Sequence, residues 1–323
     1  MTRGWALWTV CVVLAGCTGK VEVAAPDQAD LVVASSHPED MLRFLTKEFR
    51  ERTGLRVTLI RAGTGTLLGR LGDHTLAADV MLGGGLESLE AAKDLFEPYL
   101  SGEVAAIPPE FRSAEDLWTG FSVLSLLIVY NHRLVPPEAA PRGWGDLTGP
   151  RFAGVIAFAD PRQSGSAYSL LRVFRSLPQP EGLMERFVTN LRGRPLLDSA
   201  QIVGAVSSGE FLVGLTFESS DPSPDVSLVY PREGTLVLPD GVALVRGAPH
   251  PEAARRFIDF ALGPDVASVL VGRYHRRSVR TEAPDPEGLP DLGHVKPLPY
   301  DIGLAAREKD ETLARFTALW SQP

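Results

Sequence analysis

The chain has 323 residues, a formal net charge of −8 and a pI of about 5.4. This acidic balance argues against a nucleic-acid duplex or an anionic membrane surface as the binding partner. Hydrophobic residues make up 44% of the chain and charged residues 22%, which is typical of a soluble globular protein. The length is about twice that of a typical domain of roughly 150 residues, so we expect two lobes, each with its own core.

The N-terminus has the pattern of an export signal. Arg3 precedes an apolar run, Trp5–Ala15, which is too short to span a bilayer as a mature helix. The run ends in the motif LAGC, which resembles the lipobox of a bacterial lipoprotein signal and implies cleavage before Cys17 and lipidation of its thiol. The alternative is an ordinary secretory peptide with a chance cysteine. Cleavage also removes Cys11, and residues 17–30 then form a tether to the folded body.

Strands and helices alternate from Leu31 onward. LVVASS (31–36) predicts a strand, the amphipathic segment Pro38–Arg52 predicts a helix, and LRVTLI (55–60) predicts a second strand. Ser36 and Glu39 have the spacing of a capping box at the start of this helix, and Gly54 suits its end. A strand–helix–strand order predicts a right-handed parallel crossover.

Two glycine-rich loops follow predicted strands in this first half. Gly63-Thr64-Gly65-Thr66 precedes the helical segment 67–76, where glycine N–H groups and threonine hydroxyls make an anion cradle in form. Its spacing matches neither GxGxxG nor a Walker loop, and a glycine turn without a ligand is the alternative. Gly83-Gly84-Gly85 follows the strand predicted over 78–82 and indicates either a close approach to the backbone or a loose loop.

The segment Phe121–Arg133 (FSVLSLLIVYNHR) predicts a strand buried on both faces, and it joins the two halves of the chain. In the second half, a strand over 154–159 runs into Ser164-Gly165-Ser166 at the start of a helix, the same device as in the first half. Asp198 and Ser199 precede another helical stretch, and Glu218 ends the strand predicted over 211–217. The chain then returns through residues 228–245.

Ligands of open α/β sheets bind at the carboxyl ends of the strands. The loops just described all lie at such ends, so we expect them to form one crevice between the two halves. The expected ligand-binding residues are Ser35, Ser36, His37, Gly63, Thr64, Gly65, Thr66 and Gly84 from the first half, and Ser164, Gly165, Ser166, Asp198, Ser199, Glu218 and Tyr230 from the second.

A series of motifs carries a family resemblance over roughly residues 31–260. In chain order they are LVVASSHPED, IRAGTGTLLGRL, ADVMLGGG, LFEPY, LIVYN, WGDL, IAFADPRQSGSAY, GEFLVGLTFE, VYPREGT and GVALVRGAPHPEAARRFIDF. Together they resemble the extracellular solute-binding proteins of bacterial ABC importers, in particular the branch with ferric-iron-binding and hexose-phosphate-binding members. The resemblance implies an α/β, two-lobed type II periplasmic binding protein fold with a hinge of two crossing segments.

The resemblance also implies a domain plan and partners. We expect a signal peptide over 1–16, a tether over 17–30, an N-terminal lobe over 31–128 plus 236–323, and a second lobe over 129–235, with hinges at Val129–Asn131 and Tyr230–Thr235. The expected partners are a small anionic ligand, an ABC permease and its ATPase, with no nucleic acid. We expect a monomer that is anchored to the membrane through its lipid and faces the periplasm or the exterior.

No catalytic signature supports an enzyme. The sequence contains no GxSxG, HExxH or DxDxDG motif, and its six histidines show no metal-ligand spacing. We therefore expect no catalytic residue, no metal site and no cofactor. A tethered ligand-sensing ectodomain is an alternative to a transport role. The arginines at 273, 276, 277 and 280 are interpreted as a solvated face or as partners of the acidic stretch Glu282–Glu287, with partner docking as the alternative.

Ligand chemistry separates the two branches of the family. Ferric iron favours anionic oxygen ligands, and the resemblance implies an adjacent pair of tyrosines, yet none of the six tyrosines is adjacent to another. The hydroxyl-rich loops at predicted helix N-termini suit an oxyanion instead. Asp198 and Glu218 can accept hydrogen bonds from sugar hydroxyls or an amine. The sequence thus favours a sugar phosphate or an aminophosphonate, with ferric iron as the alternative.

Overall fold

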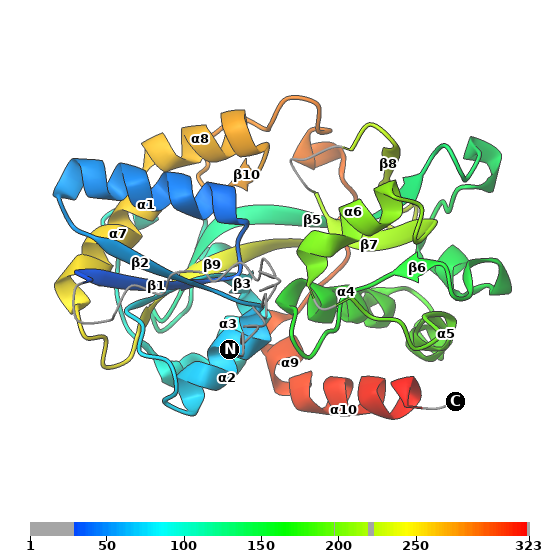
Figure 1. Ribbon diagram of the computed structural model, residues 1–323, viewed down its shortest axis with the longest axis horizontal. Helices are drawn as coiled ribbons and strands as arrows, with labels where there is room; N and C mark the ends of the chain where they lie inside the picture. The colour runs from blue at the N-terminus through cyan, green and yellow to red at the C-terminus, as the bar shows by residue number, and fades with distance from the viewer. Residues whose placement is uncertain (1–28, 197, 219–222, 322–323) are drawn as a thin grey trace, which may run out of the picture.

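The computed structural model describes residues 29–196, 198–218 and 223–321, so the expected signal peptide, Cys17 and nearly all of the tether lie outside the described residues. Strands of this part follow the order β2-β1-β3-β9-β5-β7-β6, with β4, β8 and β10 paired at the sides (Figure 1). Their bounds are β1 Leu31–Ser35, β2 Val57–Arg61, β3 Val80–Gly85, β4 Phe96–Glu97, β5 Thr119–Asn131, β6 Ile156–Ala157, β7 Val213–Phe217, β8 Val226–Val229, β9 Val237–Val245 and β10 Arg277–Ser278.

The first lobe is a sheet with helices on both faces. Strand β1 pairs in parallel with β2 and β3, whereas β9 runs antiparallel to β3 and β5. Because side chains alternate along a strand, Leu31 and Val33 enter one core cluster while Val32 and Ala34 enter the other. Helices α1 (Glu39–Thr53), α7 (Pro251–Leu262) and α8 (Pro264–Tyr274) cover the first face, and α2 (Thr64–Gly72) and α3 (Leu86–Ala91) cover the second (Figure 1).

The second lobe is built on the distal half of β5. Strand β5 pairs there with β7 and β8, and β6 extends the sheet in parallel with β7. Helices α4 (Gly165–Ser176), α5 (Leu183–Asn190) and α6 (Ile202–Ser207) belong to this lobe. One core cluster fills it, and the ring of Phe187 in this cluster contacts those of Phe158 and Phe174.

Strand β5 changes its neighbouring strands at its middle, where it passes from the first lobe to the second. The last β5–β9 pair joins Ser125 to Val237, and the next residue, Leu126, donates its N–H to the carbonyl of Leu236 at 3.0 Å before β5 turns to β7. The expected crossing at Val129–Asn131 is therefore several residues late, because that segment already pairs with β7 and β8 inside the second sheet.

The C-terminal helices contact both lobes. Helix α9 (Ile302–Arg307) packs on α3 of the first lobe, whereas α10 (Lys309–Trp320) packs on α5 of the second. Phe316 of α10 lies in the core of the second lobe. The expected assignment of the whole range 236–323 to the N-terminal lobe is thus wrong for α10, whose apolar contacts lie on the other lobe. Within the described ranges, no helix is both long and apolar enough to cross a membrane.

Candidate functional site

A cleft of about 790 Å³ lies between the lobes at the carboxyl ends of their strands. Its walls contain the loops after β1, β2 and β3 in the first lobe and the starts of α4 and α6 in the second. Its floor contains residues from β5 and β9 close to the crossing, Leu124, Leu126, Leu238, Pro239 and Asp240. This volume lies in the range of small-molecule sites, roughly 300–1,000 Å³.

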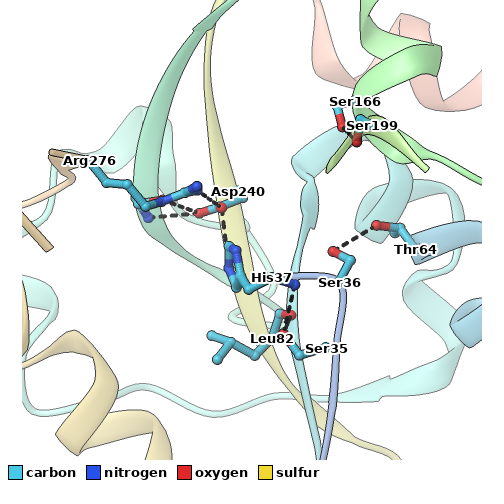
Figure 2. A network of polar contacts seen from close by, with 10 residues as sticks. Ser35, Ser36, His37, Thr64, Leu82, Ser166, Ser199, Asp240 and Arg276 are labelled. Atoms are coloured by element: carbon cyan, nitrogen blue, oxygen red, sulfur yellow. Dashed lines mark hydrogen bonds and ion pairs between the residues drawn. The ribbon is translucent and has the colours of Figure 1, made fainter. Parts of the chain in front are cut away.

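The loop after β1 presents Ser36 and His37 to the cleft. Behind it, Ser35 is buried and its hydroxyl donates to the carbonyl of Leu82 at 2.7 Å while accepting the N–H of His37 at 3.2 Å (Figure 2). Ser35 therefore holds the loop to β3 and does not line the cleft. The expected capping box is wrong, because α1 begins after Pro38 without a side-chain cap and Ser36 accepts a hydrogen bond from Thr64 instead.

The glycines at the end of β3 make room for this loop. Gly83 and Gly84 have φ angles of 99° and 94°, which side-chain-bearing residues rarely adopt. A Cβ on Gly83 would lie 2.9 Å from the Ser36 hydroxyl, and one on Gly84 would lie 2.6 Å from the methyl carbon of Thr64. The three loops of the first lobe thus pack directly on one another, which explains glycine at positions 83 and 84.

The start of helix α2 in the first lobe lies against the second lobe. Thr64, buried at its first position, donates its hydroxyl to Ser36 at 3.1 Å and faces Gly165, the first residue of α4. The N–H of Gly65 donates to the carbonyl of Gln163 in the second lobe at 3.1 Å. Gly65 therefore makes a contact between lobes, and the exposed Thr66 lies outside the cleft lining.

The second lobe contributes a cluster of three serine hydroxyls (Figure 2 labels two of them). Ser199 lies 3.2 Å from Ser164 and 3.0 Å from Ser166, measured between the hydroxyl oxygens. Ser164 also caps α4 by accepting the N–H of Ala167 at 3.3 Å. Asp198 caps the next helical turn, since its Oδ1 accepts the N–H of Ala200 at 3.0 Å. Its Oδ2 lies 3.9 Å from Nη1 of Arg61 in the first lobe.

A buried polar network closes the floor of the cleft (Figure 2). Asp240 accepts hydrogen bonds from the N–H and hydroxyl of Ser122 at 2.9 and 2.8 Å, and from Nη2 of Arg276 at 2.7 Å. Nε2 of His37 lies 3.3 Å from Oδ2 of Asp240. Burial lowers the pKa of His37 to about 4, against the opposing effect of Asp240, so the imidazole is neutral at pH 7.

Glu218 and Tyr230 lie outside the cleft lining, contrary to expectation. Arg277 donates to the carboxylate of Glu218 from Nε at 2.8 Å and from Nη2 at 3.1 Å, and the hydroxyl of Tyr230 donates to it at 2.7 Å. Glu218 is therefore buried with its charge compensated inside the protein. It does not face the cleft as a free acceptor.

The structure brings ten of the expected residues together around one cleft. Those in its lining are Ser36, His37, Gly63, Thr64, Gly84, Ser164, Gly165, Ser166, Asp198 and Ser199, and those outside it are Ser35, Gly65, Thr66, Glu218 and Tyr230. The sequence reading missed Asp40, Asp240, Arg273, Tyr274 and Arg276, which also line it. The arginine run was the available signal, but it was interpreted as a solvated face or as partners of the acidic stretch. Arg277 and Arg280 do pair with that stretch, through Asp285 and Glu282, but Arg276 and Arg277 are buried and Arg276 pairs with Asp240 at the cleft.

A metal centre needs several ligating side chains in one place. Among the described residues, no group of three or more histidine, cysteine or acidic side chains could hold a metal ion. Tyr274 is the tyrosine in the cleft lining, and burial raises its pKa. Burial and the hydrogen bond to Glu218 also raise the pKa of Tyr230, which lies outside the cleft lining.

Comparison with known proteins places this chain in a family. The family of bacterial extracellular solute-binding proteins matches residues 79–302. Iron uptake protein A1 of Synechocystis is 27% identical over 297 residues, covering 84% of this chain and 81% of that protein. A putative 2-aminoethylphosphonate-binding periplasmic protein of Salmonella typhimurium is 24% identical over 234 residues, covering 67% of each chain.

A solved structure shows the same fold. The periplasmic binding protein AfuA from Actinobacillus pleuropneumoniae, determined with exogenous fructose-6-phosphate bound, superposes with a TM-score of 0.83 at 24% identity. The match covers 91% of this chain and 99% of AfuA. The two-lobed type II periplasmic binding protein fold expected from the sequence is therefore confirmed. The chain belongs to the bacterial extracellular solute-binding proteins, and it is a solute-binding protein rather than an enzyme.

Proposed function

We propose that the protein is the lipid-anchored substrate-binding component of an ABC importer and binds a small phosphorylated organic anion between its lobes. A sugar phosphate or an aminophosphonate is the expected ligand class. The observation that carries this proposal is the hydroxyl lining of the cleft, with Ser36 and Thr64 on one side and Ser164, Ser166 and Ser199 on the other.

The placement of these hydroxyls suits a phosphoryl group. Thr64 is the first residue of α2 and Ser164 is the N-cap of α4, so the positive ends of two helix dipoles approach each other across the cleft. Hydroxyls donate to phosphoryl oxygens without bringing a charge of their own. Asp198, which lines the second lobe, can accept from a sugar hydroxyl or an amine on the same ligand.

Hinge closure is the proposed binding mechanism. A ligand that contacts both lobes stabilises the arrangement in which they meet, and only its greater affinity for that arrangement shifts the equilibrium. The exchange of strand partners at Ser125 and Leu126 supplies a short backbone segment about which the lobes can rotate. The hydrogen bond from Gly65 to Gln163 already joins the two sides of the cleft.

Calorimetry of ligand-stripped protein tests the proposal. Glucose 6-phosphate, 2-aminoethylphosphonate and ferric citrate are titrated separately, the last because iron uptake and ferric-binding proteins are among the relatives. We expect heat of binding with one of the first two ligands. Binding of ferric citrate alone would overturn the ligand class while leaving the solute-binding role intact.

A further inference from the structure

The hydroxyls of the cleft leave the charge of an anionic ligand uncompensated, but two arginines also line the cleft, Arg273 and Arg276. Arg273 is exposed and its guanidinium lies over the rings of Phe44 and Tyr274, at 5.2 and 5.3 Å from their centroids. The side chain of Arg276 is only 5% exposed. Arg276 is thus the buried cation of the cleft, where the low local dielectric strengthens its interaction with an anion.

The guanidinium of Arg276 is held in a fixed orientation along one edge. Its Nε and Nη2 donate to the hydroxyl of Ser122 at 3.2 and 2.8 Å, and Nη2 also donates to Asp240 at 2.7 Å. Among the described residues, none accepts a hydrogen bond from Nη1. Ser122 and Asp240 therefore accept the hydrogen bonds from the Nε and Nη2 edge of the planar guanidinium, while the N–H groups of Nη1 stay available to a ligand.

Two further observations describe the surroundings of Arg276. Nε2 of His37 is buried without a hydrogen-bond partner, 3.3 Å from Asp240. From the second lobe, the ring of Phe217 lies 5.7 Å from the guanidinium carbon of Arg276. The cation is thus contacted by both lobes, and an aromatic ring limits the access of water to it.

We propose that Arg276 recognises the anionic group of the ligand through Nη1, and that Asp240 and Ser122 position its guanidinium for this contact. The inference rests on the proposed function and deepens it. It adds one charged donor to the neutral hydroxyls that the proposed function assigns to the anionic group of the ligand.

A structural role for Arg276 gives a different expectation. If Arg276 only neutralises Asp240, then Arg276→Gln leaves a buried, unpaired carboxylate that repels any anion, and removing that carboxylate as well restores binding. If Arg276 contacts the ligand, the double variant Arg276→Gln/Asp240→Asn stays weak. We expect the double variant to bind the phosphorylated probe, glucose 6-phosphate or 2-aminoethylphosphonate, roughly 10- to 100-fold more weakly than the wild type. Restoration to within threefold overturns the proposal.

The variant Arg276→Lys keeps the test decisive if the double variant does not fold. Lysine keeps the charge beside Asp240 but lacks the planar fork, so we expect a loss of roughly tenfold or more in affinity. Unchanged affinity in this variant also overturns the proposal. The matched control is Arg277→Lys, a neighbouring buried arginine that pairs with Glu218 and does not line the cleft; its affinity should stay within threefold of the wild type.

The same titrations separate this inference from the proposed function. If the wild type binds neither phosphorylated probe, the ligand class is wrong and the role of Arg276 falls with it. If the wild type binds a probe and the Arg276 variants bind it equally well, the ligand class stands and only the assignment of Arg276 is wrong.

Discussion

The backbone N–H of Gly65 in the first lobe donates to the carbonyl oxygen of Gln163 in the second lobe at 3.1 Å. Beside this bond, the backbones of the two lobes come so close that Gly63 has no space for a side chain. A Cβ on Gly63 would lie 2.4 Å from the Gln163 oxygen. The described arrangement therefore depends on glycine at this point of contact between lobes.

We expect Gly63→Ala to prevent the lobes from meeting. The φ angle of Gly63 is −60°, which alanine adopts without strain, so the variant should fold normally and fail only at the contact with Gln163. Ligand affinity should fall roughly tenfold or more. Small-angle X-ray scattering at saturating ligand should give a larger radius of gyration for the variant than for the wild type. Gly69→Ala is the control, because nothing lies within 4 Å of its added Cβ; a variant that closes like this control would contradict the expectation.

Removing the hydroxyl of Thr64 should weaken ligand binding. Thr64→Val keeps the shape of the side chain and removes the hydroxyl proton, which donates to Ser36 in the described arrangement and which we expect to turn to the ligand. The loss of one hydrogen bond to a charged group should cost about 1–3 kcal/mol of binding free energy by calorimetry. Thr66→Val is the matched control, since Thr66 is exposed two residues away and does not line the cleft. Ser164→Ala should weaken binding by a similar amount and also lower stability by about 1 kcal/mol, because Ser164 caps α4. Equal affinities in Thr64→Val and Thr66→Val would exclude Thr64 as a ligand contact.

His37 should make the fold less stable in mild acid. Burial lowers its pKa from 6.5 to about 4, so between these values the unfolded chain binds a proton that the folded protein does not. The free energy of unfolding therefore falls as the pH drops through this window, by up to about 3 kcal/mol from this residue. Urea denaturation at pH 7 and pH 4.5 should show a smaller loss in His37→Gln than in the wild type. The same loss in both proteins would show that His37 does not carry the effect.

Glu87 should act in the opposite direction. This first-lobe carboxyl is buried at the start of α3, where Oε1 accepts a hydrogen bond from Ser169 of the second lobe and Oε2 has no partner among the described residues. Burial raises its pKa, against the effect of Ser169 and of the nearby cations Lys309 and Arg172. Stability from this group is therefore lost as the pH rises through the folded-state pKa.

The variant Glu87→Gln tests this sign. It keeps the hydrogen bond from Ser169 and removes the charge, so its stability relative to the wild type should increase between pH 5 and pH 8 in denaturant titrations. A constant difference between the two proteins over this range would mean that the ionisation of Glu87 does not affect folding.

Lipidation is tested at Cys17. The motif LAGC closing a short apolar run predicts that Cys17→Ser gives a soluble product when the protein is expressed in a bacterial host. Fractionation followed by immunoblotting should move the variant from the membrane fraction to the soluble fraction. A variant that stays with the membrane would mean that the protein is held there by something other than a lipid on Cys17.

Much of the fold could be predicted because its signals are local. Short apolar runs predicted β1, β2, β3 and β7, and the glycine and serine loops after strands predicted most of the cleft walls. The position of the crossing was not predictable in this way. Residues 121–131 form one apolar run, and periodicity shows that a strand is buried but does not show which neighbour it pairs with on either side of Leu126.

The buried charges were missed because their partners are remote in sequence. Arg276 pairs with Asp240, 36 residues away, and Arg277 pairs with Glu218, 59 residues away. A run of arginines next to an acidic stretch is usually exposed, and Arg280 does pair with Glu282 as that pattern indicates. Glu218 was expected in the cleft for the same reason, since its position at a strand end was visible and its pairing with Arg277 was not.

The C-terminal helices connect the two lobes at a further point. With α9 on the first lobe and α10 on the second, Glu308 is the single residue between them, and its carboxylate is paired with both Arg172 and Arg175 of α4. Any rotation that separates α3 from α4 must bend the chain at this joint or break its ion pairs. For the proposed hinge motion, we therefore expect substitutions at Glu308, which does not line the cleft, to change the amplitude of opening without changing ligand selectivity.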